Sequence, residues 1–258
     1  MQLVILCGGL GTRLREETAF IPKPMVQIGD RPVLWHIMKL YACHGVKEFI
    51  LALGYKGDVI RQYFLHYDIM NCDVTVDLSR RDGLKVHNLH HESDWCVTLA
   101  DTGASTLKGG RLKRVEPHVA SDTFLMTYGD GLTDVSISEL IRFHNSHGKI
   151  ATVTGVNPLA RFGELKIDGS RVTAFFEKPT QNRDFINGGF FVFSRRIFDY
   201  LSPSEECDLE VGALEAVARE GELMVFKHDG FWACMDTQRD REYLNEIWQR
   251  GNAPWKLW

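Results

Sequence analysis

The sequence lacks the marks of a membrane or secreted protein. No apolar run among its 258 residues reaches the roughly 18 residues that a membrane-spanning helix needs, so we expect no membrane association. The opening MQLVILCGG has neither a basic region nor a cleavage site, and it predicts a strand rather than a signal peptide. The six cysteines are scattered without a CxxC pair, which favours reduced thiols in the cytoplasm. The net charge is -4, so we expect no nucleic-acid partner.

Strand-like and helix-like segments alternate along most of the chain. Apolar runs predict strands, one with its following loop, at 2–7, 47–53, 73–78, 121–131, 150–156, 186–194 and 223–228. Helical spacing predicts helices at 31–45, 56–67, 137–148, 208–221 and 237–250. Residues 162–179 predict a hairpin that turns at Asp168–Gly169. This order predicts an α/β fold: a Rossmann-like, mixed and mostly parallel sheet flanked by helices, with an inserted hairpin. We expect one domain, 1–258.

A glycine-rich loop, GGLGTRL at residues 8–14, follows the first predicted strand. It is not a P-loop, because no Gly-Lys-Ser/Thr follows, and it lacks the third glycine of the dinucleotide fingerprint. Consecutive glycines let backbone N–H groups converge on an anion, and Arg13 adds a planar fork of donors suited to phosphate oxygens. The loop therefore indicates a phosphate site, although an ordinary turn with a surface arginine has the same composition.

Further candidate residues lie at predicted strand ends and turns. Lys23 stands between two prolines, which stiffen the backbone and direct the side chain. Asp130 follows a buried strand, where a carboxylate suits Mg²⁺, although Gly-Asp-Gly is also a common turn. Asn187 opens a strand beside two glycines and suits either hydroxyl recognition or a bulge. Asp236 follows a strand and could equally cap the last helix.

Taken together, these segments resemble one family. GGLGTRL, PKPM, GDG, EKP, NGG and MDT occur here in the order found in the sugar-1-phosphate nucleotidylyltransferases, and the resemblance covers nearly the whole chain. The segments KPMVQIG, PVLWHIMK, RFGEL, INGGFFVF and GNAPWK look most like its cytidylyltransferase members. The resemblance implies the nucleotide-diphospho-sugar transferase type of fold. It further implies that about 1–160 bind the nucleotide and about 161–258 serve sugar binding, with a sugar-side lid, and oligomerisation.

The implied reaction transfers a cytidylyl group from CTP to α-D-glucose 1-phosphate, with Mg²⁺ as cofactor, and gives CDP-glucose and pyrophosphate. The attacking phosphate is already anionic, since its second pKa is about 6, so no general base is needed. Two alternatives stay open: the same reaction with another sugar 1-phosphate or with UTP, and a non-catalytic relative that binds an effector. The second is disfavoured, since Arg13, Lys23 and both aspartates are present.

The resemblance also implies roles for individual residues. Arg13 would hold the β- and γ-phosphates and Lys23 the α-phosphate, which makes these two the catalytic candidates. Asp130 and Asp236 would hold Mg²⁺. The implied nucleotide-binding residues are Leu6, Gly8, Gly9, Gly11, Thr12, Arg13, Lys23, Gly110, Arg111 and Asp130. The implied sugar-phosphate residues are Gly163, Glu177, Lys178 and Asn187.

Three other stretches bear on these expectations. Residues 209–214 read LEVGAL where cytidylyltransferases have a Trp-Glu-x-Glu-Pro-Leu-like segment, which bears on the identity of the sugar. His87, His90 and His91 have no companion ligands at metal-binding spacing, so we expect no metal there. The tail carries Trp248, Trp255 and Trp258. We expect a homo-oligomer in which this tail or the segment 109–114 reaches a neighbouring subunit.

Overall fold

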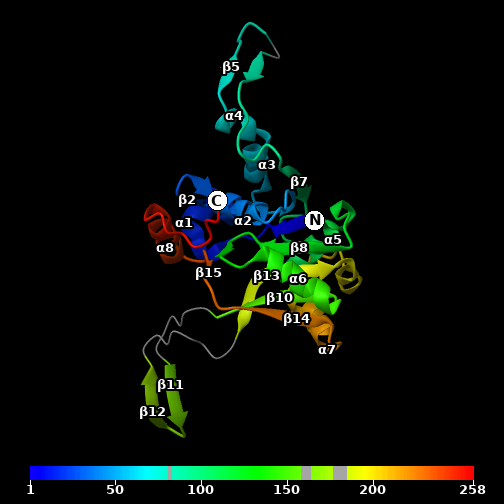
Figure 1. Cartoon of the computed structure of the whole chain (residues 1–258), viewed down its shortest axis with the longest axis vertical. Coiled ribbons are helices and arrows are strands. Elements are labelled where there is room, and N and C mark those ends of the chain that lie inside the picture. The colour runs from blue at the N-terminus through cyan, green and yellow to red at the C-terminus, as the bar shows by residue number, and fades with distance from the viewer. Residues whose placement is uncertain (81–82, 158–163, 177–184) are drawn as a thin grey trace.

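A seven-stranded sheet forms the centre of the molecule (Figure 1). The computed structural model describes the whole chain except residues 81–82, 158–163 and 177–184. In spatial order, the strands are β14 (Leu223–His228), β10 (Ala151–Val156), β13 (Ile186–Ser194), β8 (Thr123–Tyr128), β1 (Gln2–Leu6), β4 (Glu48–Leu53) and β7 (Cys96–Asp101). Only β13 runs antiparallel to its neighbours, β8 and β10. The predicted mixed, mostly parallel sheet is confirmed.

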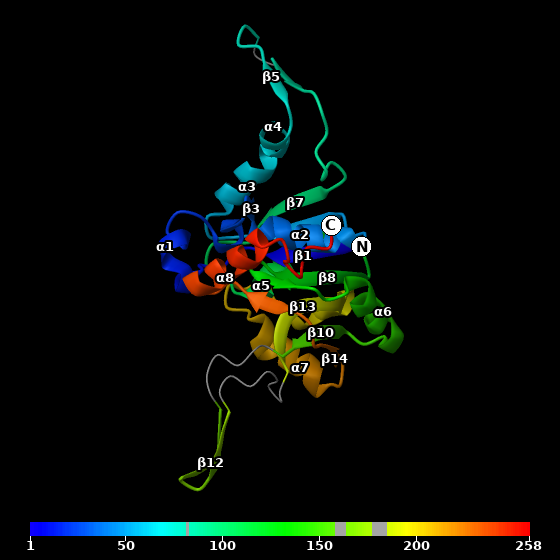
Figure 2. The same cartoon turned by 60° about the vertical axis from the view of Figure 1, so that its left-hand side comes forward.

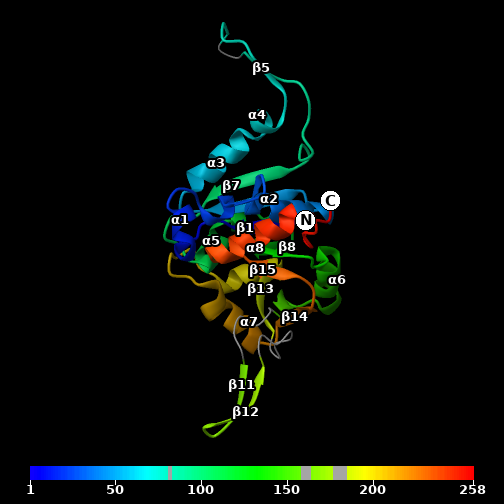
Figure 3. The ribbon, with the colours of Figure 1, turned by 90° about the vertical axis from the view of Figure 1, so that its left-hand side faces the viewer.

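Helices cover both faces of the sheet (Figures 2 and 3). The α-helices are α1 (Arg15–Thr18), α2 (Val33–Cys43), α3 (Gly57–Leu65), α4 (Tyr67–Asn71), α5 (Lys108–Arg114), α6 (Ile137–His147), α7 (Glu215–Arg219) and α8 (Gln238–Gln249). Shorter helical turns are η1 (Thr12–Leu14), η2 (Lys23–Met25), η3 (Glu116–His118), η4 (Arg195–Tyr200) and the π-helical η5 (Leu209–Leu214). Among the described residues, no helix has the length and apolar character that crossing a membrane requires.

The period of two along each strand divides the core into two layers. On one face, Leu3 and Ile5 of β1 pack in a cluster with α2, α6, α8 and the C-terminal tail. On the other face, Val4 and Leu6 pack with α5, η4 and α7. Both faces of β1 are therefore buried, as its uninterrupted apolar run predicts.

Four two-stranded sheets lie outside the central one. They pair β2 (Gln27–Ile28) with β3 (Arg31–Pro32), β5 (Val74–Val76) with β6 (Leu84–Val86), β9 (Gly131–Thr133) with β15 (Trp232–Cys234), and β11 (Glu164–Asp168) with β12 (Arg171–Phe176). The hairpin predicted at 162–179 is thus present over 164–176, and the rest of the predicted range lies outside the described residues. Its turn residues are Gly169 and Ser170, because Asp168 pairs directly with Arg171.

The strand predicted at 73–78 was wrongly expected in the central sheet. Instead, β5 and β6 form the tip of an arm, residues 67–92, that projects beyond α3 in all three views (Figures 1–3). The strand that does join the sheet after α3 is β7, which the sequence analysis missed. The helix predicted at 208–221 is also interrupted, because Gly212 has a φ of 103°, a conformation that only glycine adopts readily.

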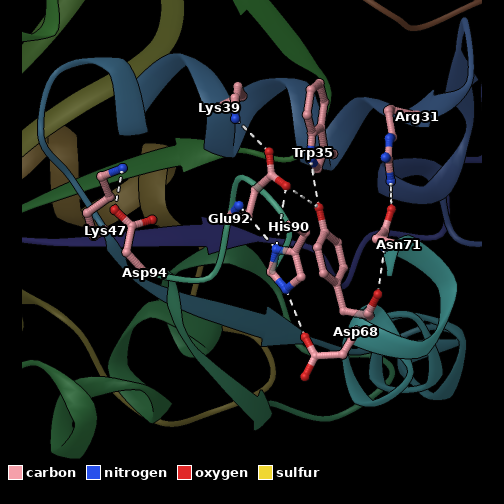
Figure 4. A network of polar contacts seen from close by, with 10 residues as sticks. Arg31, Trp35, Lys39, Lys47, Asp68, Asn71, His90, Glu92 and Asp94 are labelled. Atoms are coloured by element: carbon pink, nitrogen blue, oxygen red, sulfur yellow. Dashed lines mark hydrogen bonds and ion pairs between the residues drawn. The ribbon is translucent and has the colours of Figure 1, made fainter. Parts of the chain in front are cut away.

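The arm is anchored to the body by buried polar contacts (Figure 4). Glu92, 7% exposed, accepts a hydrogen bond from Lys39 of α2 at 2.5 Å. His90 lies 2.8 Å from Asp68 of α4 through Nε2, and the indole N–H of Trp35 donates to the Tyr67 hydroxyl at 2.9 Å. Among the histidines of this stretch, His90 thereby has a structural role.

Candidate active site

A cleft of about 540 Å³ opens at the carboxyl ends of β1 and β8, where ligands bind in open parallel sheets. It gathers most of the residues singled out in the sequence. The predicted residues that line it are Leu6, Gly8, Gly9, Gly11, Thr12, Lys23, Arg111, Asp130, Asn187 and Asp236. The side chain of Arg13, and all of Gly163, Glu177 and Lys178, lie outside the described part of the structure. Gly110 is buried in α5, against the carbonyl of Ser204.

Lys23 lies between the two aspartates of the cleft. Its ammonium is 2.6 Å from Oδ2 of Asp130 and 2.6 Å from Oδ1 of Asp236. Burial by itself would lower the pKa of Lys23, but the charge of Asp130 and the hydrogen bonds that the ammonium donates to both carboxylates outweigh it and raise the pKa. The lysine is therefore a cation at neutral pH. Pro22 precedes η2 in an extended conformation. Its ring restricts the backbone just before Lys23, and this restricts the direction of the Lys23 side chain.

The pairing of β9 with β15 brings Asp236 to Asp130. Gly131 pairs with Cys234, and the Met235 N–H donates to the carbonyl of Asp130 at 2.9 Å. The alternative role for Asp236, capping the last helix, is taken by Thr237, whose side chain accepts from the N–H of Asp240 in a complete capping box. Asp236 is thus left with its carboxylate at the cleft.

Two positions of the cleft require glycine, one for its backbone conformation and the other for close packing. Gly11 has a φ of 61°, which lets the chain turn from β1 into η1. A Cβ on Gly129 would lie 2.9 Å from the carbonyl oxygen of Leu6 and 2.9 Å from Cγ of Pro24, so a side chain there would separate β8 from β1 and η2. Both features bring the glycine loop, Lys23 and Asp130 to one edge of the cleft.

Arg111 is held behind the glycine loop by a network that the sequence did not reveal. Its side chain is almost fully buried at 4% exposure. The guanidinium donates to Gly8 O, Leu53 O, Thr102 Oγ1, Gly103 O and Ala104 O. A Cβ on Gly8 or on Gly54 would collide with the guanidinium. Arg111 therefore ties the first turn of the glycine loop to the end of β4, and its two terminal nitrogens are engaged with protein acceptors.

Several lining residues were not predicted. They include Thr106, Leu107, Lys108, Tyr128 and Trp232. The indole N–H of Trp232 donates to the carbonyl of Gly188 at 2.8 Å. Nothing in the spacing of these residues in the sequence indicated that they line the cleft.

The cysteines of the cleft are neutral thiols. Burial raises the pKa of Cys7, and Asp130 raises it further against the opposing charge of Arg111. Cys7 is fully buried, and its N–H donates to the carbonyl of Ala52 at 3.0 Å. Burial and Asp130 likewise raise the pKa of Cys234. The raised pKa of each thiol disfavours a thiolate at both positions.

The matching profile of a protein family covers nearly all of these elements. A family described as "Nucleotidyl transferase" matches residues 2–237. The chain belongs to the nucleotidyl transferase family. This nucleotidyl transferase is 50% identical over 259 residues to a glucose-1-phosphate cytidylyltransferase of Salmonella typhi, with 100% of both chains covered. It is 43% identical to a probable glucose-1-phosphate cytidylyltransferase of Bacillus subtilis over 258 residues, again with 100% of both covered.

A solved structure agrees with the family assignment. HddC from Yersinia pseudotuberculosis is 25% identical to this nucleotidyl transferase and superposes with a TM-score of 0.68. The match covers 96% of this chain and 99% of that chain. The expected fold is therefore shared over 96% of this chain.

Proposed function

We propose that this nucleotidyl transferase transfers a cytidylyl group from CTP to α-D-glucose 1-phosphate, giving CDP-glucose and pyrophosphate. The observation that carries the proposal is the 50% identity over full length to a protein of that name. The cleft supports it, because a glycine loop, a buried lysine and two carboxylates converge there. This set suits two phosphorylated substrates.

In the proposed reaction, an oxygen of the sugar phosphate attacks the α-phosphorus of CTP, and the bond from that phosphorus to the bridging oxygen of pyrophosphate breaks. The nucleophile carries its own negative charge, so the protein's task is to position and neutralise two polyanions. We assign the loop from Gly8 to Thr12 to the nucleotide phosphates together with Arg13. Lys23 faces the α-phosphate, where its positive charge stabilises the additional negative charge of the transition state.

The donor set fits Mg²⁺. Among the described residues, ligand atoms of Asp130, Cys234 and Asp236 lie within 4.8 Å of one another. Two carboxylates are the ligands that Mg²⁺ prefers, whereas the neutral thiol of Cys234 is a poor one. We therefore propose that Asp130 and Asp236 hold the ion. When bound there, Mg²⁺ would neutralise phosphate charge on the nucleotide.

We propose that the sugar phosphate binds on the side of Asn187, together with Gly163, Glu177 and Lys178. The whole chain then acts as one domain, with residues 1–160 mainly serving the nucleotide and 161–258 mainly serving the sugar. The interleaved sheet supports a single domain, because β13 of the second part pairs with β8 of the first.

The proposal is tested by measuring pyrophosphate release with CTP, UTP, dTTP and GTP, each against glucose, galactose and mannose 1-phosphates. We expect the pair CTP and glucose 1-phosphate to exceed the others by at least tenfold in kcat/KM. A higher value for UTP or for another sugar would replace the substrate assignment and keep the reaction. Nucleotide binding without pyrophosphate release from any pair would instead identify an effector-binding relative.

We also propose a homo-oligomer, with the arm as the contact between subunits. The earlier expectation gave this contact to the tail or to 109–114. The structure instead buries Trp255 completely in its own chain, and Gly109 packs against the carbonyl of Asp208. The arm carries exposed apolar side chains, of which Leu78 is 93% exposed and Leu89 83%. Light scattering of the intact protein at micromolar concentration tests the assembly, and a monomer mass would refute it.

A further inference from the structure

A continuous chain of hydrogen bonds runs from the kinked segment η5 to the wall of the cleft. The Tyr128 hydroxyl donates to Oε1 of Glu210 at 2.5 Å. Lys108 of α5 donates to the same oxygen, and its ammonium lies 5.2 Å from the centre of the Tyr128 ring. Nδ2 of Asn187 then donates to the Tyr128 hydroxyl at 3.2 Å. Lys108, Tyr128 and Asn187 line the cleft, and Glu210 stands behind them.

The chemistry of these groups fixes the direction of every hydrogen bond. A carboxylate only accepts, so the single proton of the Tyr128 hydroxyl is committed to Glu210. The hydroxyl can then only accept from Asn187, which must turn its NH₂ toward it. At the other end, the backbone N–H of Gly189 donates to Oδ1 of Asn187 at 2.8 Å. The amide therefore has one orientation, and among the described residues its second N–H has no hydrogen-bond acceptor, while Asn187 itself lines the cleft.

The backbone around Glu210 is itself held in place. Oδ1 of Asp208 accepts from the N–H groups of Glu210 at 2.8 Å and of Val211 at 2.9 Å. The backbone leaves helical geometry at Val211 and Gly212. This is the segment in which the sequence departs from the cytidylyltransferase pattern, yet an acid remains at position 210. The other carboxylate oxygen, Oε2, is buried without a hydrogen-bond partner among the described residues, so Lys108 supplies the compensating charge.

We infer that Glu210 is a positioning residue for the sugar 1-phosphate, acting through Tyr128 to make Asn187 a hydrogen-bond donor toward the cleft. The group that Asn187 recognises is then an acceptor, a sugar hydroxyl oxygen or a phosphate oxygen. The inference rests on the proposed function, which places the sugar phosphate beside Asn187. It assigns specificity to a residue that lies outside the cleft wall.

The test compares Tyr128→Phe, Glu210→Gln and the double variant with the wild type, using the full-length protein. Loss of the Tyr128 hydroxyl leaves the Asn187 amide held only at Oδ1, by the Gly189 N–H, and one hydrogen bond typically accounts for about a three- to tenfold change. We expect KM for glucose 1-phosphate to rise by that factor in Tyr128→Phe, while KM for CTP stays within about twofold. In the double variant, KM for glucose 1-phosphate should rise no further than in whichever single variant raises it more, because both substitutions remove the same chain of contacts.

A matched control is available in Tyr200, whose hydroxyl donates to Glu220 at 2.5 Å outside this cleft. Tyr200→Phe should leave both KM values unchanged. Equal KM values for glucose 1-phosphate in wild type and Tyr128→Phe would overturn the inference, and additive losses in the double variant would overturn the route through Tyr128. If a variant loses its fold by circular dichroism, the folded single variant decides.

The proposed function fails separately, if the wild type forms no CDP-glucose. In that case, calorimetry with glucose 1-phosphate decides the inference, since weaker binding by Tyr128→Phe supports it and equal or absent binding overturns it.

Discussion

The ammonium of Lys23 lies 2.6 Å from Oδ2 of Asp130, in the space between the two carboxylates of the cleft. The sequence assigned these residues to separate tasks, the lysine to a phosphate and the aspartate to a metal. With the proposed metal site at Asp130 and Asp236, a divalent cation and the lysine would compete for the same oxygens. Before substrates bind, Lys23 compensates the charge that Mg²⁺ would compensate afterwards.

Replacing Lys23 by methionine should therefore have two opposite effects. Mn²⁺, used as a spectroscopic probe for Mg²⁺, should bind the nucleotide-free variant at least tenfold more tightly, as followed by electron paramagnetic resonance. Turnover should fall by about 10²–10³, as for other groups that stabilise transition-state charge. Lys39→Met is the control, because it removes a similarly buried lysine–carboxylate pair, 2.5 Å from Glu92, outside the cleft. Unchanged Mn²⁺ affinity in Lys23→Met would contradict the competition.

Removing either carboxylate tests the metal assignment. Asp130→Asn and Asp236→Asn should each abolish most turnover, since an amide supplies no charge to the ion. Excess chelator should do the same to the wild type. The exposed Asp94→Asn, which breaks only the surface pair with Lys47, is the control. Full activity in either variant, with an unchanged melting temperature, would remove that residue from the metal site.

The buried guanidinium of Arg111 predicts which glycines tolerate a methyl group. Gly54→Ala should lower stability by about 1–3 kcal/mol, the usual cost of overpacking, because its Cβ meets the guanidinium. A Cβ on Gly9 meets nothing within 4 Å, so Gly9→Ala should fold with nearly normal stability. Urea unfolding of both variants measures the difference. Equal stability of Gly54→Ala and the wild type would show that Arg111 is not held as described.

The fold was largely predictable, because apolar residues recur at clear strand or helix spacing in most of its elements. The uninterrupted apolar segment of β1 and the helical spacing of α2 gave both the elements and their burial. The strand β7 was missed because it follows a long polar stretch and stands at the sheet edge, where its residues are only partly buried. The polar alternation of β5 looked like a sheet strand but belongs to the arm, since alternation does not say which partner a strand finds.

The site was predictable as a set of residues and not as an arrangement. Each motif marked a residue at a strand end, but the meeting of Asp130 with Asp236 depends on β9 and β15, two strands of three residues. No pattern of that length is readable in sequence. Arg111 lines the cleft as expected, but the network that holds its guanidinium was not predictable. Four of its five acceptors are backbone carbonyl oxygens, which leave no trace in side-chain identity.

The buried His36, which the C-terminal tail covers, predicts how stability depends on pH. His36 is fully buried, and its Nδ1 accepts from the indole N–H of Trp255 at 3.4 Å, while Nε2 lies 2.9 Å from the carbonyl of Ile28. Burial lowers the pKa of His36 from 6.5 to about 4. Below pH 6.5 this histidine binds a proton in the unfolded chain but stays neutral in the native protein. The free energy of unfolding therefore falls as the pH drops from 6.5 toward 4.

At pH 5 this loss amounts to about 2 kcal/mol relative to neutral pH. His36→Gln removes the titration while keeping a polar side chain, so its free energy of unfolding should decrease less than that of the wild type between pH 7 and pH 5. The variant also isolates His36 from His144, whose pKa is lowered to about 4 by burial and persists in both proteins. Urea unfolding at the two pH values measures the difference, and parallel losses in both proteins would show that His36 titrates normally.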